Sequence, residues 1–401
     1  MIPSEMKTLG EVCEFHNGKA HEKAISEDGE YKVVNSKFIS SEGKSFKLTD
    51  HAMFPLFEGD ICFVMSDVPN GKTLAKCFLV DADDTYSLNQ RICAIKTSCF
   101  DLKFLFYQLN RHPYLLSFNN GENQTNLRKA DILNCPLWMP PISEQQRIVA
   151  ILDQAFADIE KARTNAVQNL KNARELFDSY LQQVFSQHDE GWETSKLKDI
   201  TLKIGSGATP RGGKDAYKVE GTPLIRSMNV HDRSFIEKNL AFIDDQQAAK
   251  LNNVIVEKGD VLLNITGASV ARCCVAHEDF LPARVNQHVS IIRVDKAVVS
   301  PEFLNFMLTS KFYKDQLLGI GEAGSTRQAI TKAQIENFTV GYPRQINDQI
   351  NLLEGLFSLE EKTLKVQRVY EAKLKSLDEL KKSILQKAFS GELAKSKGIA
   401  A

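Results

Sequence analysis

The sequence predicts an α+β protein in which two duplicated, mixed α/β globular domains are separated by two long antiparallel helices. Three observations predict this fold. The chain repeats itself with a period of about 200 residues, the first part of each copy mixes strand and helix patterns, and the second part carries an apolar stripe at helical spacing. Because this period is far longer than that of a solenoid, each copy is expected to be a whole domain with an appended helix.

The repeat runs through the whole chain in constant order, and the offset between partners drifts only between about 188 and 204 residues. Matching segments, first copy before second, are KTLGEV (7–12) and SKLKDI (195–200), FEGDICF (57–63) and EKGDVLL (257–263), NQRICAI (89–95) and NQHVSII (286–292), and LDQAFADIEK (152–161) and LEGLFSLEEK (353–362). The duplication predicts a pseudo-two-fold symmetric protein.

Within each copy, the pattern of apolar residues changes once, from a mixture of strand and helix patterns to one long helical pattern. Short β-branched runs such as DICFVM and HVSIIRV, mixed with turn residues and helix patterns, predict a mixed α/β domain. After two prolines, Ser143 and Gln146 have the spacing of a capping box, which predicts the start of a long helix. The predicted division is a first domain over 1–142, a long helix over 143–188, a second domain over 189–346, a second long helix over 347–392 and a tail over 393–401.

The two long helices are expected to pair as a coiled coil, because their apolar positions recur in steps of three and four. About forty residues at 1.5 Å each make a rod of roughly 60 Å, which is longer than a domain of this size is wide. This length argues against a helix that only covers its own domain. The positions predicted to pair are Ile148, Leu152, Ile159, Leu170, Phe177 and Val184 in the first helix, and Leu356, Leu359, Val366, Leu374, Leu377 and Ile384 in the second.

The composition is that of an ordinary soluble protein, with 43% apolar and 25% charged residues. No run of eighteen apolar residues and no signal-peptide pattern is present, so a cytoplasmic location is expected. Eight cysteines without a CxxC pair predict neither a disulfide framework nor a metal site. The net charge of −1 does not by itself indicate a nucleic-acid partner, but eight arginines in 189–346 against three in 1–142 favour anion contacts in the second domain.

Enzymatic motifs are weak. GIGEAG at 319–324 satisfies GxGxxG, but it follows a helix pattern, and Arg344 stands where a ribose-binding acid should be. NCPLW at 134–138 has only one of the two prolines that an adenine methyltransferase motif needs. The repeated NQ at 89–90 and 286–287 could bind adenine edges, although its place at the mouth of an apolar strand favours a turn-holding role. No catalytic residue is predicted.

The order of segments resembles the specificity subunit of type I restriction-modification enzymes over essentially the whole chain. The segments that carry the resemblance are PPISEQQRI (140–148), the helix end YLQQVFSQ (180–187), the opening GWETSKLKDI (191–200), GSGATP (205–210) and the helix end ILQKAFSGEL (384–393). The chain departs from the family pattern where the second long helix begins with PRQINDQ and where the first domain has HNGKAHEK in place of GSGATPRG.

The resemblance implies a non-catalytic subunit whose two target-recognition domains each read one half of a split DNA sequence. It implies that the paired helices set the spacer and dock two methyltransferase subunits, which use S-adenosylmethionine, and that restriction and translocation subunits can join them. No cofactor is expected in this chain. The alternative is an adaptor that does not bind DNA, with the coiled coil as its functional surface.

Candidate DNA contacts are polar loop residues that differ between the two copies, since short polar and arginine side chains can reach phosphates or base edges. They are Lys19, Lys37, Asn123, Gln124, Thr125 and Arg128 in the first domain, and Thr209, Arg211, Lys214, Arg226, Ser325, Thr326, Arg327 and Gln328 in the second.

Overall fold

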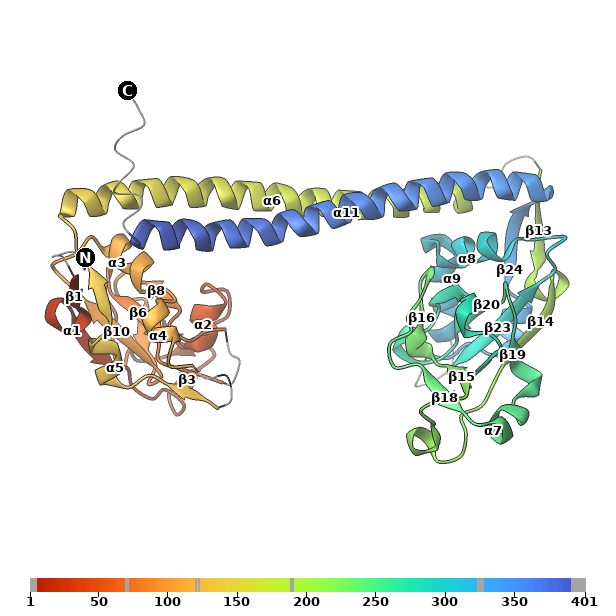
Figure 1. Ribbon diagram of the computed structural model, residues 1–401, viewed down its shortest axis with the longest axis horizontal. Helices are drawn as coiled ribbons and strands as arrows, with labels where there is room; N and C mark the ends of the chain where they lie inside the picture. Colours follow the sequence, from red (N-terminus) through yellow and green to blue (C-terminus); the bar gives the residue numbers. More distant parts are fainter. Residues whose placement is uncertain are drawn as a thin grey trace, which may run out of the picture. The chain divides into compact units, whose positions relative to one another are not determined.

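The computed structural model describes residues 6–68, 72–119, 121, 123–187, 191–322 and 328–390. The predicted tail 393–401 and the candidates Ser325, Thr326 and Arg327 lie outside these residues. The chain forms two compact units, Met1–Asn165 with Lys373–Ala401, and Ala166–Ala372 (Figure 1). Each unit contains one domain and one stretch of each long helix, so the helix pair is found in both units.

The first domain is a mixed α/β domain with two four-stranded sheets, ordered β2-β10-β6-β8 and β3-β5-β4-β9. Its elements are β1 (Met6–Thr8), α1 (Leu9–Val12), β2 (Glu14–Asn17), β3 (Ile25–Ser26), β4 (Tyr31–Val34), α2 (Ser36–Ser40), β5 (Leu48–Thr49), β6 (Ile61–Val64), β7 (Ser66–Asp67), β8 (Cys77–Leu79), β9 (Tyr86–Leu88), β10 (Ile92–Lys96), α3 (Leu102–Leu109), α4 (Pro113–Leu116), β11 (Thr125–Asn126), α5 (Lys129–Leu133) and β12 (Pro136–Trp138).

The second domain repeats this plan with sheets ordered β14-β23-β20-β21 and β18-β15-β22-β19. Its strands and α-helices are β13 (Trp192–Lys196), β14 (Thr201–Ser206), β15 (Thr222–Ile225), β16 (Val230–His231), β17 (Ser234–Phe235), β18 (Ala241–Ile243), α7 (Asp245–Ala249), β19 (Ile255–Val256), β20 (Val261–Asn264), β21 (Cys273–Val275), β22 (Ala283–Val285), β23 (Val289–Val294), α8 (Pro301–Thr309), α9 (Lys311–Glu322), α10 (Lys332–Glu336) and β24 (Thr339–Pro343). Its 3₁₀ helices are η1 (Leu197–Asp199), η2 (Gly213–Ala216), η3 (Ser227–Asn229), η4 (Asn252–Val254), η5 (Gly267–Ser269) and η6 (Glu278–Phe280).

We call the sheets β2-β10-β6-β8 and β14-β23-β20-β21 the central sheets of the two domains. Each central sheet is buried on both faces, which explains why its strands are continuously apolar. In β6, Ile61 and Phe63 join the core under α3, whereas Cys62 and Val64 join the core shared with α2. Strands β20 and β23 alternate in the same way between two cores of the second domain. Since successive strand side chains point to opposite faces, one strand feeds two cores.

The long helices are α6 (Ile142–Ser186) and α11 (Ile346–Phe389), of 45 and 44 residues. In the first unit, Arg163 of α6 pairs with Asp378 of α11 at 2.6 Å, and Lys381 lies over the ring of Phe156. In the second unit, Arg174 pairs with Glu371 at 3.3 Å. The contacted residue of α11 has a lower number as the residue of α6 has a higher one. The two helices therefore pair antiparallel (Figure 1).

The start of each long helix is fixed by a buried glutamine and not by the expected capping box. Helix α6 already begins at Ile142, so Ser143 and Gln146 lie inside its first turns and both are exposed. The buried side chain of Gln145 accepts a hydrogen bond from the Asp101 amide at 2.8 Å and donates to the Pro140 carbonyl. At the start of α11, the side chain of Gln349 likewise accepts a hydrogen bond from the Ser300 amide and donates one to the Pro343 carbonyl.

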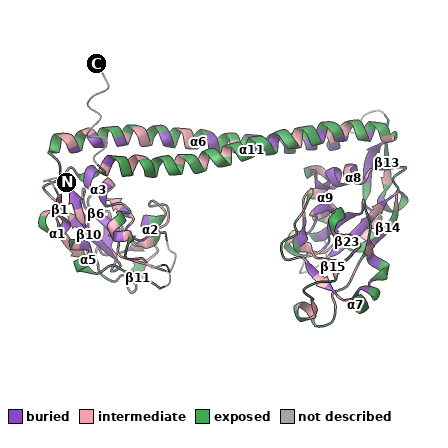
Figure 2. Ribbon diagram, viewed as in Figure 1, coloured by how far each residue is buried: buried purple, intermediate pink, exposed green. Residues whose placement is uncertain are grey.

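Buried positions recur along both long helices (Figure 2), and their apolar stripes pack into the cores of the domains as well as between the helices. Ile148, Leu152 and Ile384 belong to the core of the first domain, as Phe177, Val184, Leu356 and Leu359 belong to that of the second. Ile159 is buried, and Leu170, Leu374 and Leu377 are half-buried. The placement of Val366 in the seam is wrong, because its side chain is 41% exposed. The neighbouring Gln367 is half-buried and meets Arg174 at 3.5 Å. No helix among the described residues has both the length and the apolarity of a membrane span.

Candidate nucleic-acid interface

Polar loops meet at one edge of the central sheet in each domain. In the second domain, β14 and β20 end where β23 begins, since Ser206 pairs with Ser290 and Asn264 with Val289. In the first domain, β2 and β6 end where β10 begins, since Asn17 pairs with Cys93. We call these two places the loop edges of the first and second domain. They contain residues 17–22, 35–37, 65–68, 72–76, 89–91 and 123–126, and 206–211, 226–229, 265–272, 286–288 and 328.

The two loop edges share one backbone frame. The amide of Met65 donates to the carbonyl of Arg91 at 3.2 Å, as the amide of Ile265 donates to that of His288 at 3.0 Å. The remaining pairs of equivalent bonds, first domain before second, are Asn89 to Val34 and Asn286 to Ile225 (3.1 Å each), Leu127 to Met65 and Ile330 to Ile265 (2.8 Å each), and Val64 to Lys76 (3.1 Å) and Asn264 to Arg272 (2.8 Å). The frame satisfies these backbone groups without side chains, which leaves the side chains at matching positions free to differ.

Asn286 holds the turn before its strand. Its side-chain oxygen accepts a hydrogen bond from the His288 amide at 3.0 Å, and its backbone is part of the frame. The glutamine that follows each asparagine is exposed, but it also has a partner: Gln90 donates to Glu22 at 2.8 Å, and Gln287 accepts from Thr209.

Most candidates in the first domain lie at its loop edge. Lys19 is exposed and forms a β-bridge with Asn89, and Lys37 is exposed at the start of α2, directly after β4. Gln124 donates to Ser66 at 2.8 Å, beside the exposed Asn123. Thr125 donates to the Asn119 side chain at 3.2 Å.

Arg128 lies directly beyond the loop edge, because the amide of the preceding Leu127 donates to the Met65 carbonyl, and its contact with DNA stays a prediction. It precedes α5, where its amide donates to Asp131 at 2.8 Å. Helix α5 packs against α1, where Gly10 approaches Leu133, and α1 precedes β2. This end of β2 is opposite the loop edge.

The candidates in the second domain divide into side chains that are exposed and side chains with internal partners. Arg211 is exposed and lines a hollow of about 560 Å³ with Gln247 and Lys250 of the α7 region. Arg226 instead lies over the Tyr217 ring at 5.2 Å and donates to the Asn239 carbonyl.

The two remaining described candidates of the second domain are Gln328 and Lys214. Gln328 donates to Glu322 at 2.9 Å. The backbone of Lys214 belongs to η2.

One carboxylate in the first loop edge serves the loop itself. Partial burial alone would raise the pKa of Asp67, but hydrogen bonds from Thr73, Val68 and Leu74 outweigh it and lower this pKa. Asp67 accepts the Thr73 amide at 2.7 Å. A carboxylate bound by several amides stays ionised and holds the loop shape.

The sequence did not single out Met228, Arg272 and His288, which line a hollow of about 450 Å³ in the second loop edge. For Arg272, the repeat contained a signal that could have identified it. Cys77 and Cys273 begin the equivalent strands β8 and β21, and the residues directly before them are Lys76 and Arg272. The preceding loop differs in length between the copies, which hides this match.

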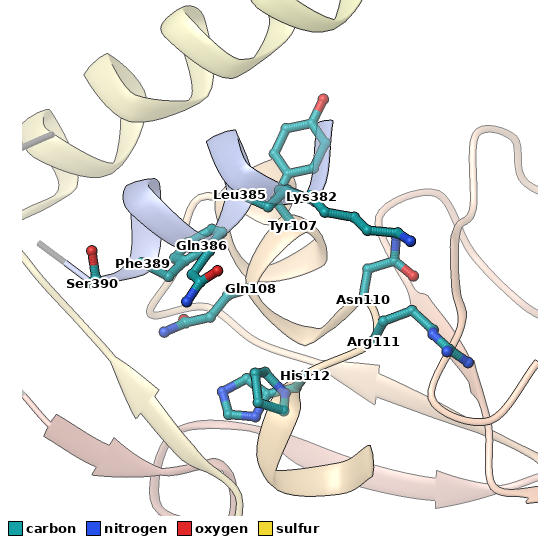
Figure 3. A pocket seen from close by; sticks show the side chains of 11 residues that line it. Tyr107, Gln108, Asn110, Arg111, His112, Lys382, Leu385, Gln386, Phe389 and Ser390 are labelled. Carbon is teal, nitrogen blue, oxygen red and sulfur yellow. The ribbon is translucent and has the colours of Figure 1, made fainter. Parts of the chain in front are cut away.

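A separate hollow of about 550 Å³ lies in the first unit between the α3–α4 junction and the end of α11 (Figure 3). Tyr107, Arg111 and His112 line it from the domain, and Lys382 and Phe389 line it from α11 (Figure 3). Burial lowers the pKa of His112. Arg111 donates to the carbonyls of Lys72 and Leu74, so this wall of the hollow is fixed to the loop that Asp67 organises.

The loop edges offer guanidinium, ammonium, amide and hydroxyl groups, which are the groups that bind phosphates and base edges. Among the described residues, no group of three His, Cys, Asp or Glu side chains could hold a metal ion. Two domains with one frame and different side chains form a pair of related binding surfaces.

The chain belongs to the type I restriction modification DNA specificity domain family, which matches residues 1–169 and 189–375. It is 24% identical over 339 residues to the type I restriction enzyme EcoBI specificity subunit of Escherichia coli, covering 76% of this chain and 69% of that protein. It is 21% identical over 299 residues to the EcoKI specificity subunit of Escherichia coli strain K12, covering 69% of this chain and 62% of that protein.

Two solved structures have the same fold. One is a chain from a study of complex assembly and conformational transition of the type I R-M system, with a TM-score of 0.76, 21% identity and coverage of 97% of this chain and 98% of that one. The other is the HsdS subunit from Thermoanaerobacter tengcongensis, with a TM-score of 0.59, 20% identity and coverage of 97% of both chains.

Proposed function

We propose that this chain is the DNA sequence-specificity subunit of a type I restriction-modification complex and that each domain reads one half of a bipartite target through its loop edge. The observation that carries this proposal is the shared backbone frame with different side chains. His288 replaces Arg91 and Arg272 replaces Lys76 on equivalent hydrogen bonds. Two such surfaces recognise two different short sequences, since base edges are distinguished by the donors and acceptors presented to them.

The same proposal gives the paired helices two roles, which are to set the spacer between the half-targets and to dock methyltransferase subunits. Exposed apolar side chains on the helices support docking: Leu176 of α6 is 57% exposed and Val369 of α11 is 58% exposed. Such side chains on otherwise polar helices suit a partner surface. The partner methyltransferase would bind S-adenosylmethionine and carry out the chemistry, and restriction subunits would join this core.

The test is co-expression with the cognate methyltransferase subunit, followed by mapping of modified adenines on genomic DNA. One bipartite sequence with a constant spacer is the expected result, and the methyltransferase alone should show no such sequence. Modification that does not depend on this chain, together with no DNA affinity in the presence of the partner, would favour the adaptor alternative.

Docking is tested separately by L176E and V369E, which place a charge on the proposed contact surface. Each variant should lose co-purification with the methyltransferase subunit. The matched control is V219E, because Val219 is 97% exposed and belongs to the second domain, outside the residues of both long helices. Equal retention of the partner by all three variants would contradict helix docking.

A further inference from the structure

The hollow in the second loop edge is built from three separate segments. Ser227 and Met228 follow β15, residues 266–269 and Arg272 follow β20, and His288 precedes β23. Backbone bonds of the shared frame fix all three segments, because Ile265 is bound to His288 and Asn286 to Ile225. The hollow is therefore positioned by the sheet and not by a single loop.

The Arg272 side chain is half-buried in this hollow while its backbone is held on both sides. Its carbonyl accepts from Asn264 at 2.8 Å, and its amide donates to Ser269 at 3.2 Å. Within the part of the chain that the structure describes, its guanidinium has neither a hydrogen bond nor an ion pair. The hollow's lining contains no carboxylate.

The equivalent residue of the first domain is used internally. The Lys76 ammonium donates to the Ser40 carbonyl at 3.2 Å and lies 3.6 Å from the Glu42 carboxylate. The two domains thus place a cation at the same backbone position. Only in the second domain are the N–H groups of this cation, the guanidinium of Arg272, left for a ligand among the described residues. This difference separates Arg272 from a cation that merely supports the fold.

The neighbours of Arg272 suit a base edge better than a phosphate. Met228 is 43% exposed and supplies an apolar wall at the position that Lys37 occupies in the first domain. His288 is held by Thr266 and Gln287, so its ring is fixed in the lining of the same hollow. A guanidinium that shares a hollow with an apolar side chain and a fixed ring can present its flat fork to a base edge, and this fork matches the O6 and N7 acceptors of guanine. A lone phosphate contact would require neither of these neighbours.

We infer that Arg272 is a specificity-determining residue of the second domain and that it reads a guanine in that domain's half of the target. This inference rests on the proposed function. It assigns one residue of this chain to one base of a bipartite sequence and leaves the other half of the sequence to the first domain.

The test uses the full chain co-expressed with the methyltransferase subunit and a plasmid library in which every position of the mapped wild-type target is randomised. R272A should lose the preference for guanine at one position of one half-target by about 10-fold to 100-fold, the range expected for a bidentate arginine contact. R272K keeps the charge but not the fork, and it should lose the same preference while retaining more of the total methylation.

The matched control is K76A, which removes the equivalent cation from the first domain. It should leave the base preferences changed by R272A intact. Thermal melting of each variant checks folding, and R272K carries the test if R272A proves unstable.

Three outcomes would count against the reasoning in different ways. A wild-type complex without a bipartite preference would overturn the proposed function itself. A specific wild-type complex whose R272A and R272K variants keep every base preference would overturn the inference alone. Weaker methylation that is uniform across all sequences would identify Arg272 as a phosphate contact and would also overturn the inference.

Discussion

Arg233 joins the second domain to both long helices, and its removal is expected to loosen this attachment. Its Nε donates to Glu360 of α11 at 2.7 Å, and its Nη1 donates to Thr309 at the end of α8. The guanidinium also lies over Phe177 of α6 at 4.8 Å and over Phe306 of α8 at 5.9 Å. One side chain therefore contacts three helices of the second unit.

The cost of R233A follows from these contacts. The side chains of Arg233 and Glu360 are only 20% and 22% exposed, so solvent screens their interaction less than it screens a surface pair. A hydrogen bond between charged groups contributes about 1.5–3 kcal/mol, and a partly desolvated cation–π contact about 1 kcal/mol. We expect R233A to weaken the attachment by about 3 kcal/mol, which is roughly a 100-fold change in the equilibrium for local opening.

Hydrogen exchange measured by mass spectrometry on peptides from α8 and from residues 352–363 tests this expectation. R233A should raise exchange at both places by up to about 100-fold at neutral pH, given that exchange follows the local opening free energy. The control is K311A, which breaks the exposed pair between Lys311 and Asp315 on α9 and should cost only about 0.5 kcal/mol. Equal exchange in R233A and K311A would refute the reasoning.

Three further predictions concern the long helices, the cysteines of both domains and one carboxylate of the first long helix. Insertion of seven residues into each long helix lengthens the pair by about 10 Å, so the preferred spacer should grow by about three base pairs, and a constant spacer in methylation mapping would contradict this. Burial raises the pKa of Cys62, Cys93 and Cys273, whereas Cys99 is exposed, so C99S should remove the fast phase of thiol labelling at pH 8. Burial would raise the pKa of Asp153, but hydrogen bonds from Lys103 and Tyr107 lower it, so its stabilising effect should be complete at neutral pH and be lost as acidification passes the lowered pKa. Acid unfolding should therefore show wild type and D153N differing at pH 7 and converging once the pH falls below the lowered pKa of Asp153, and a gap that widens with acid would contradict this.

Sequence periodicity was enough to predict the duplication, the two long helices and the mixed domains, because these features depend on spacing within continuous segments. The seam of the coiled coil was predicted less well at Val366. An apolar pattern cannot show that Gln367 faces the partner helix, where it meets Arg174 at 3.5 Å. A long polar pair can lie at the solvent-facing rim of a helix pair, where each side chain satisfies the other.

The candidate site was predicted only in part, because contacts between distant segments decide which side chains remain available. Arg226 and Arg272 look alike in the sequence, yet Arg226 is held by Tyr217 and the Asn239 carbonyl. The internal role of Lys76 depends on Ser40 and Glu42, more than thirty residues away. Such pairings arise from sheet topology, and no local pattern reports them.

The duplicated frame separates the residues that hold the fold from the residues that can read DNA. Asp60 in the first domain and Asp260 in the second are buried, and each accepts a hydrogen bond from a backbone amide at the turn before β6 or β20. Gln145 and Gln349 fix the starts of the two long helices. Replacing such a residue leaves buried groups without partners, which costs about 1–3 kcal/mol for each group. Some side chains that differ between the loop edges, such as Arg272, satisfy no bond of the frame and have no internal partner among the described residues, and surface changes of that kind usually cost less than about 0.5 kcal/mol. Since a new target sequence can arise from changes at the second kind of position, one scaffold can acquire new specificity in either domain with little loss of stability.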